Sequence, residues 1–202
     1  MAQARLVLAS TSPFRAALLE RLGMPFLRAD PQVDETPLPQ ESPQALVMRL
    51  AEAKARAVAP AYPDALIIGS DQMAWIDGQI LGKPGNRENT IAQLLQLSGK
   101  VVTFYTGLCL FHSSTGKAQV HCEPFQVQFR ALSQLQIERY VDRERPFQCA
   151  GGFKSEGLGI TLFESLKGED PNALIGLPLI RLVSMLQLEG IDPLTADPAG
   201  AA

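Results

Sequence analysis

Cysteine and histidine are scarce in this sequence. Its 202 residues include three cysteines, Cys109, Cys122 and Cys149, and two histidines. An odd number of widely spaced cysteines favours reduced thiols that pack in the interior over a disulfide framework or a zinc site. His112 and His121 stand apart from any acid or serine pattern, so we interpret them as surface or strand residues.

The chain also lacks a strong excess of charge and any long apolar run. Eighteen basic and 21 acidic residues give a net charge of −3, which leaves no broad positive field for a polynucleotide. No segment approaches the roughly 18 to 20 continuous apolar residues of a membrane span, and the first residues lack the layout of a secretory signal. We therefore expect a cytoplasmic protein with no nucleic-acid or membrane partner.

What the sequence does have is enough apolar content for a substantial core. Hydrophobic residues make up 46% of the chain, and neither a repeat nor a long linker divides it. Strand-helix units come first and antiparallel strand patterns follow, so we expect an α/β fold with a mixed sheet. The predicted organisation is one domain with two lobes over residues 1–194 and a flexible tail over residues 195–202.

Local signals predict where the elements lie. Ser12-Pro13 and Ser42-Pro43 each supply a cap residue followed by proline, the pattern of a helix start. Residues 30–41, between these two helices, form a proline-rich acidic loop of a length that is often functional. Further elements are predicted as a hairpin at residues 73–80, a helix from Asn86 to near Gly99, strands at 101–111 and 125–129, a helix from Ser133 to near Arg145, and a last helix before Gly190.

Three sets of residues could bind phosphate. Ser10, Thr11 and Ser12 precede a helix whose first turn holds Arg15, and a helix N-terminus favours an anion through its free N–H groups and partial positive charge. Lys83 lies between glycine and proline, and Lys154 lies in a glycine-rich segment at residues 151–157, where the backbone can approach a ligand closely. Helix capping and solvated surface lysines remain the alternatives.

A second candidate group is acidic. The apolar run at residues 65–69 predicts a buried strand that ends at Asp71, and ligands bind at such strand ends. Asp34 and Glu35 lie on the acidic loop that could close over it. Carboxylates and water are the usual ligands of the hard divalent cation that triphosphate hydrolysis needs, and Asp71 could deprotonate water. The alternative is that Asp71 caps a turn and the other two are an exposed acidic pair. P-loop and dinucleotide fingerprints are absent.

Taken in order, six short motifs resemble those of the Maf family of nucleoside triphosphate pyrophosphatases. They lie at residues 8–15, 33–36, 53–54, 68–72, 82–84 and 176–178. The resemblance extends from about residue 5 to residue 192. It implies the elongated Maf/ITPase-like α/β fold, in which helices flank a mixed central sheet and two lobes surround a deep cleft. It also implies a homodimer that uses a divalent cation, Mg²⁺ or Mn²⁺, to cleave a nucleoside triphosphate.

The resemblance also assigns roles to individual residues. It implies that Asp71 is the general base and that Glu35 helps to hold the metal. It places Ser10, Arg15, Lys54 and Lys83 at the phosphate end, which for Ser10, Arg15 and Lys83 agrees with the local chemistry above.

Three positions separate this chain from the branch of the family that acts on dTTP and UTP. Phe14, Gln72 and Glu156 stand where that branch has arginine, threonine and the glutamine of an Ile-Gln-Gly segment. This combination resembles the branch acting on 7-methyl-GTP, which removes a modified nucleotide from the pool.

N7 methylation makes guanine cationic, so the Glu156 carboxylate would complement the base and an aromatic face would add about 0.5 to 2 kcal/mol. The alternatives are the same cleavage on dTTP, UTP or another modified nucleotide, and a non-catalytic nucleotide-binding regulator of septation. The intact Asp71, Glu35 and lysine set argues against the latter.

Overall fold

The protein is built around one mixed seven-stranded sheet. The computed structural model describes residues 5–196, and the strand order is β2-β1-β3-β5-β6-β7 with β4 paired to β3. β1, β2 and β3 are parallel, and all other pairs are antiparallel. The strands are β1 (Arg5–Ala9), β2 (Leu27–Ala29), β3 (Ala65–Ile76), β4 (Gln79–Leu81), β5 (Val101–His112), β6 (Ala118–Phe129) and β7 (Phe163–Lys167).

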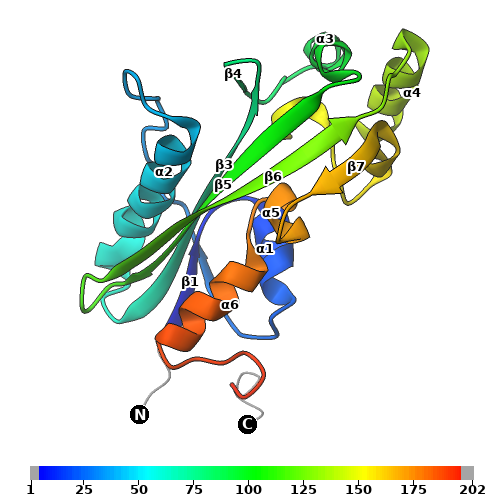
Figure 1. The fold of residues 1–202 in the computed structure, drawn as a ribbon. Coiled ribbons are helices and arrows are strands. Elements are labelled where there is room, and N and C mark those ends of the chain that lie inside the picture. Colours follow the sequence, from blue (N-terminus) through cyan, green and yellow to red (C-terminus); the bar gives the residue numbers. More distant parts are fainter. Residues whose placement is uncertain (1–4, 197–202) are drawn as a thin grey trace.

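Helices cover both faces of this sheet, which confirms the predicted α/β class with a mixed central sheet flanked by helices. In Figure 1, α2 lies on one side of the long strands, α1, α5 and α6 lie on the other, and α3 and α4 lie toward the far end. The helices are α1 (Pro13–Glu20), α2 (Pro43–Val58), α3 (Arg87–Leu97), α4 (Gln134–Glu144), α5 (Pro171–Ile175) and α6 (Leu179–Leu188), with short 3₁₀ turns η1 (Ala59–Ala61), η2 (Ala150–Gly152) and η3 (Leu158–Leu162). Separate apolar clusters fill the two faces.

The helix starts expected from the sequence are confirmed. The Ser12 and Ser42 side chains accept hydrogen bonds from the backbone N–H groups three residues on, each with proline at the first helical position. Asn86 caps α3, and Ser133 forms a full capping box for α4. These caps satisfy N–H groups that have no partner inside the helix.

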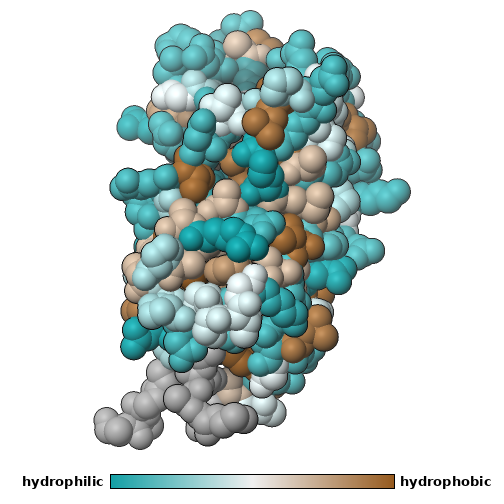
Figure 2. Space-filling model, turned by 90° about the vertical axis from the view of Figure 1, so that its left-hand side faces the viewer, coloured by the Kyte–Doolittle hydropathy of each residue, from teal (hydrophilic) through white to brown (hydrophobic). Residues whose placement is uncertain are grey.

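Two glycines allow α2 to lie directly on the sheet. A Cβ atom at Gly69 of β3 would lie 2.0 Å from the carbonyl oxygen of Ala51, and one at Gly107 of β5 would lie 2.0 Å from that of Val47. Because no side chain separates helix from sheet there, Lys54 of α2 reaches the surface of β3. Figure 2 shows this side of the molecule, where apolar residues are scattered among hydrophilic ones.

The prediction that a buried strand ends at Asp71 is wrong. β3 continues for 12 residues to Ile76, because β5 pairs with it from Leu66 to Trp75. Its other edge is interrupted instead. The pairing with β1 stops at Gly69, and the pairing with β4 starts at Ala74. Asp71 therefore emerges beside a gap in the neighbouring strands, not at the end of its own strand.

The chain end is only partly described. Residues 197–202 of the predicted tail lie outside the described residues. Within 5–196, Ala196 donates its backbone N–H to the Asp192 carbonyl at 2.8 Å and packs against the apolar cluster of α6. None of the helices in this range is both long enough and apolar enough to span a bilayer.

Candidate active site

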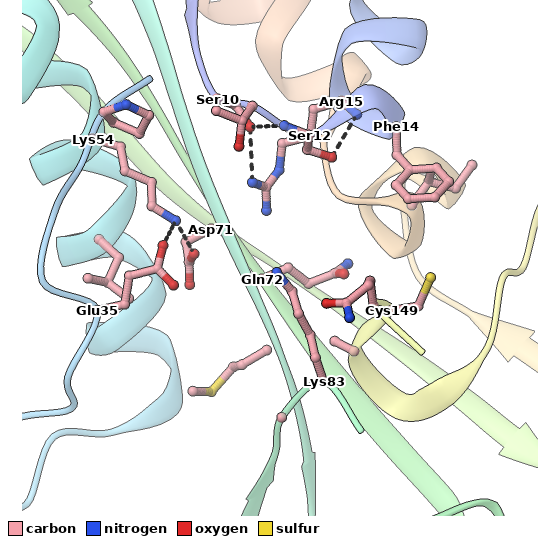
Figure 3. Close-up of a pocket in the computed structure, with 18 of the residues that line it drawn as sticks. Ser10, Ser12, Phe14, Arg15, Glu35, Lys54, Asp71, Gln72, Lys83 and Cys149 are labelled. Carbon is pink, nitrogen blue, oxygen red and sulfur yellow. Dashed lines mark hydrogen bonds and ion pairs between the residues drawn. The ribbon is translucent and has the colours of Figure 1, made fainter. Parts of the chain in front are cut away.

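A cleft of about 740 Å³ opens along the interrupted edge of β3. The start of α1 and residue Lys54 of α2 face each other across Asp71 and Gln72, and Lys83 points toward the same centre (Figure 3). The cleft brings together nearly all of the predicted site residues, which are Ser10, Phe14, Arg15, Glu35, Lys54, Asp71, Gln72, Lys83 and Glu156.

Lys54 bridges two carboxylates at one side of the cleft. Its Nζ lies 2.6 Å from Asp71 Oδ1 and 2.5 Å from Glu35 Oε1. The Lys54 and Asp71 side chains are only 7% and 13% exposed, whereas that of Glu35 is 61% exposed. Burial acts to raise the pKa of Glu35, but the hydrogen bond and charge of Lys54 outweigh it, so the pKa lies below its usual value. Lys54 thus holds both side chains at one place in the cleft, and its charge favours the ionised form of Glu35.

The acidic loop that carries Glu35 is also attached to α2 by Arg49. The guanidinium binds both carboxylate oxygens of Glu41, at 2.6 and 2.8 Å, and donates to the Thr36 carbonyl at 3.1 Å. Asp34 is outside the cleft lining. Its carboxylate accepts from the hydroxyl and backbone N–H of Thr36, which lowers the pKa of Asp34. Asp34 therefore stabilises the turn of the loop, and of these two loop acids only Glu35 faces Lys54.

The start of α1 presents hydroxyls and a guanidinium. The Ser10 hydroxyl accepts from the Ser12 N–H at 3.2 Å and from Arg15 Nη1 at 3.4 Å. Arg15 Nε donates to the Gly176 carbonyl at 2.9 Å, which fixes the guanidinium at the cleft wall. Burial lowers the pKa of Arg15, and the charges of Asp71 and Glu35 oppose that shift. A helix N-terminus with such groups is suited to a phosphate.

The two glycine-associated lysines differ. Lys83 is exposed, lines the cleft and points toward its centre (Figure 3). Lys154 does not line it. Its ammonium donates to the Glu144 carbonyl at 3.0 Å and lies 3.5 Å from the Glu144 carboxylate. A cation at the last turn of α4 is stabilised by the helix dipole as well, so the structure does not bring Lys154 to the phosphate end.

The three residues expected to set specificity all line the cleft, Gln72 on its floor in β3 and Phe14 and Glu156 above it. Phe14 is half-buried at the start of α1, and Glu156 is exposed on the turn that follows η2. Gly151 and Gly152 shape the segment leading to this turn with φ angles of 77° and 71°, values that glycine adopts without strain. The Gln72 side chain points to the other face of β3 and donates Nε2 to the carbonyls of Ala173 and Leu174, at 2.7 and 3.0 Å.

Some residues that shape the cleft were assigned no role from the sequence. The buried Ser70 and Thr106 hydroxyls donate to the carbonyls of Gly176 and Ala173, both at 2.9 Å, and so attach α5 and the residue after it to the sheet. Ser70 lies in the motif at residues 68–72, whereas nothing in the local sequence distinguishes Thr106 from other strand hydroxyls. Cys149, interpreted as a packing residue, lines the cleft, and burial raises the pKa of its thiol. All three cysteines are free, as expected.

A divalent metal can be tested against this geometry. Between residues 5 and 196, no three His, Cys, Asp or Glu side chains are grouped as metal ligands. Mg²⁺, however, is commonly held by one or two carboxylates together with water and substrate phosphates. Glu35 and Asp71 already converge on one cationic group, Lys54. The residues therefore fit a metal that arrives with a phosphorylated ligand.

Fold and cleft together define an α/β protein whose open sheet edge carries a lysine-bridged carboxylate pair opposite an anion-binding helix start. Residues 5–189 match the protein family described as Maf-like protein, and the chain belongs to that family. It is 59% identical, over 185 residues, to the 7-methyl-GTP pyrophosphatase of Nitrosococcus oceani, an alignment that covers 92% of this chain and 93% of that protein. The family resemblance seen in the sequence motifs is confirmed.

Proposed function

We propose that this protein hydrolyses 7-methyl-GTP to 7-methyl-GMP and pyrophosphate and so removes a modified nucleotide from the pool. The observation that carries the proposal is the 59% identity, over nearly the full length of both chains, to a protein named for that activity. The cleft supports it independently, since it combines cationic groups for a polyphosphate with a carboxylate that can act on water.

In the proposed reaction, Asp71 orients a water molecule and takes its proton as the oxygen attacks the α-phosphorus. The bond to the bridging oxygen breaks, and pyrophosphate leaves with that oxygen. Lys54, 2.6 Å from Asp71, holds this side chain in place before attack. A general base of this kind typically contributes about 10² to 10⁴ in rate.

The phosphates would be held from two sides. Ser10 and Arg15 at the α1 start and Lys83 at the end of the β3–β4 hairpin place donors around the cleft centre. Mg²⁺ or Mn²⁺ held by Glu35, Asp71 and phosphate oxygens would neutralise charge on the polyphosphate. With Glu35 and Asp71 engaged in this way, the Lys54 ammonium would be available to a phosphate oxygen.

The base would lie toward Phe14 and Glu156. A delocalised positive charge on 7-methylguanine is attracted by the Glu156 carboxylate and by an aromatic face. Within the family resemblance, we further propose a homodimer acting in the cytoplasm, with residues 1–194 as a single bilobed domain.

The decisive experiment is a panel of triphosphates with pyrophosphate detection, run with Mg²⁺ and with excess chelator. We expect the highest kcat/KM on 7-methyl-GTP, pyrophosphate as the product, and no turnover with chelator. A higher kcat/KM on dTTP or UTP would reassign the substrate. Orthophosphate as the main product would place cleavage at the terminal phosphate. Full turnover in excess chelator would show that the reaction needs no metal.

A further inference from the structure

The floor of the cleft is a stretch of β3 with no strand beside it. The chain turns away from β3 after Ala9, where the Ser10 N–H donates back to the Leu8 carbonyl at 2.9 Å. β4 rejoins the same edge of β3 only at Ala74, which pairs with Leu81. The last bridge with β1 joins Ala9 to Gly69, so backbone groups of residues 71–73 that point to this edge have no strand partner there.

The register shows which backbone groups these are. In an antiparallel ladder, alternate residues direct both N–H and C=O to the same neighbouring strand. On β5, the His112 N–H donates to the Lys117 carbonyl at 2.9 Å, and the Lys100 carbonyl accepts from Phe129 at 2.9 Å. Even-numbered residues of β5 thus face β6, and odd-numbered ones face β3. The bond from the Ser113 N–H to the Ala65 carbonyl, at 3.0 Å, agrees with this alternation.

The same alternation applies to β3 and identifies Gln72 as the residue whose backbone groups have no strand partner. Asp71 pairs with Gly107, and Met73 pairs with Tyr105, so Asp71 and Met73 direct their backbone groups to β5. Gln72 lies between them and directs its N–H and C=O to the opposite edge, into the cleft. An unpaired backbone donor and acceptor in a recess is costly unless water or a ligand satisfies it.

The Gln72 side chain does not bind the open N–H and C=O groups at this edge of β3. Its amide nitrogen is engaged by Thr106 Oγ1 at 3.1 Å and by the carbonyls of Ala173 and Leu174. The side chain thus anchors α5, and the backbone of the same residue stays open to the cleft. Substrate recognition by position 72 would then come from the main chain.

We propose that the main-chain N–H and C=O of Gln72 bind the O6 and N1–H of the guanine base. One residue of an extended strand presents a donor beside an acceptor, and the amide edge of guanine offers the complement. A phosphate has only acceptors and would meet the C=O unfavourably. The cationic 7-methyl ring makes N1–H a stronger donor, so its bond to the carbonyl is charge-assisted. This inference rests on the proposed function and deepens it.

Amide hydrogen exchange measured by NMR tests the proposal residue by residue. With saturating 7-methyl-GMP and Mg²⁺, exchange of the Gln72 N–H should slow at least about tenfold. The amides of Asp71 and Ala74 are matched controls, because β5 and β4 already bind them, and they should change little. Pyrophosphate with Mg²⁺ should leave Gln72 unprotected.

A second ligand tests the carbonyl. In 1,7-dimethyl-GMP the positive charge is kept and the N1–H is lost, so we expect at least about tenfold weaker binding than for 7-methyl-GMP. Equal affinity for the two ligands, equal Gln72 protection by pyrophosphate, or no protection at saturating 7-methyl-GMP would each overturn the proposal. Turnover of 7-methyl-GTP is measured separately. If the enzyme is active but its Gln72 N–H is not protected, this inference is wrong and the proposed function still stands.

Discussion

Lys54 of α2 and Asp71 of β3 form a 2.6 Å ion pair at the wall of the cleft, and both side chains are largely shielded from solvent. The same ammonium binds Glu35 at 2.5 Å. The Lys54 ammonium therefore connects α2 with the centre of β3 and with the acidic loop. Removing one carboxylate still leaves Lys54 a partner, which permits charge-altering variants that keep the fold.

Asp71→Asn should lower kcat by about 10² to 10⁴ and leave the protein folded. The amide is nearly isosteric and retains an oxygen for Lys54, but it cannot take a proton or hold a cation as well. Steady-state kinetics with pyrophosphate detection measures the loss, and thermal unfolding checks the fold. Asp77→Asn, at the exposed β3–β4 turn, is the control. Near wild-type turnover of Asp71→Asn would remove this residue from the mechanism.

Arg49→Gln should raise the Mg²⁺ concentration needed for half-maximal activity several-fold, with a smaller change in kcat at saturating Mg²⁺. The substitution releases Glu41 and the Thr36 carbonyl, so the loop must be ordered when the metal binds. A Mg²⁺ titration of initial rates separates the two effects. Arg56→Gln, which removes a surface pair with Glu52 on the same helix, should behave like wild type. Equal Mg²⁺ dependence in all three proteins would contradict the positioning role.

The ion pair of Glu41 with Arg49 should make a pH-dependent contribution to stability. The hydrogen bond from Arg49 lowers the pKa of Glu41 from 4.5 to about 2. A depressed pKa stabilises the fold above the unfolded value and loses that stabilisation as the pH falls toward the folded value. Between about pH 4.5 and 2, Glu41→Gln should therefore show a shallower loss of unfolding free energy than wild type in urea titrations. Parallel curves would show that the pair has no such effect.

Glu156→Gln should lower kcat/KM for 7-methyl-GTP by about ten- to hundredfold and leave the values for GTP and UTP nearly unchanged or raised. The amide keeps the shape and removes the charge that complements the cationic base, a loss on the order of 1.5 to 3 kcal/mol. Glu164→Gln, on the exposed β7 surface, is the matched control. A small, uniform change across all substrates would mean that Glu156 is only a solvated turn residue.

Gly69→Ala should destabilise the protein by about 1 to 3 kcal/mol or more, because its Cβ would lie 2.0 Å from the Ala51 carbonyl and push α2 off the sheet. Urea unfolding measures the loss. At Gly82 a Cβ would meet open space, so Gly82→Ala should change the unfolding free energy by less than about 0.5 kcal/mol. Equal stability of both variants would show that the helix–sheet contact adapts freely.

The helix starts could be predicted from the sequence because capping is local. Ser12, Ser42, Asn86 and Ser133 all cap the helices expected of them. The surroundings of Asp71 could not be predicted, since the gap beside it depends on where β1 and β4 end. β7 was missed because its exposed residues do not alternate with buried ones, and α5 was missed because five residues give no helical period.

Contacts between charged side chains from different elements also could not be predicted from the sequence. The glycines around Lys154 suggested a phosphate ligand, but Glu144, ten residues earlier in the chain, binds its ammonium. Conversely, the acidic loop already suggested that Glu35 lies near Asp71, but Lys54 joined them only through the family resemblance. Their convergence on one ammonium required the packing of α2 on β3, which Gly69 and Gly107 permit.

The groups that would carry out the cleavage and the Glu156 carboxylate come from separate parts of the chain. Ser10, Arg15, Lys54 and Asp71 all precede residue 84, whereas Glu156 lies on a turn that two left-handed glycines introduce. That turn can change its side chains without moving the groups that would carry out the cleavage. Grafting residues 148–157 from a relative with another preference is therefore a route to new nucleotide selectivity with the same bond cleaved.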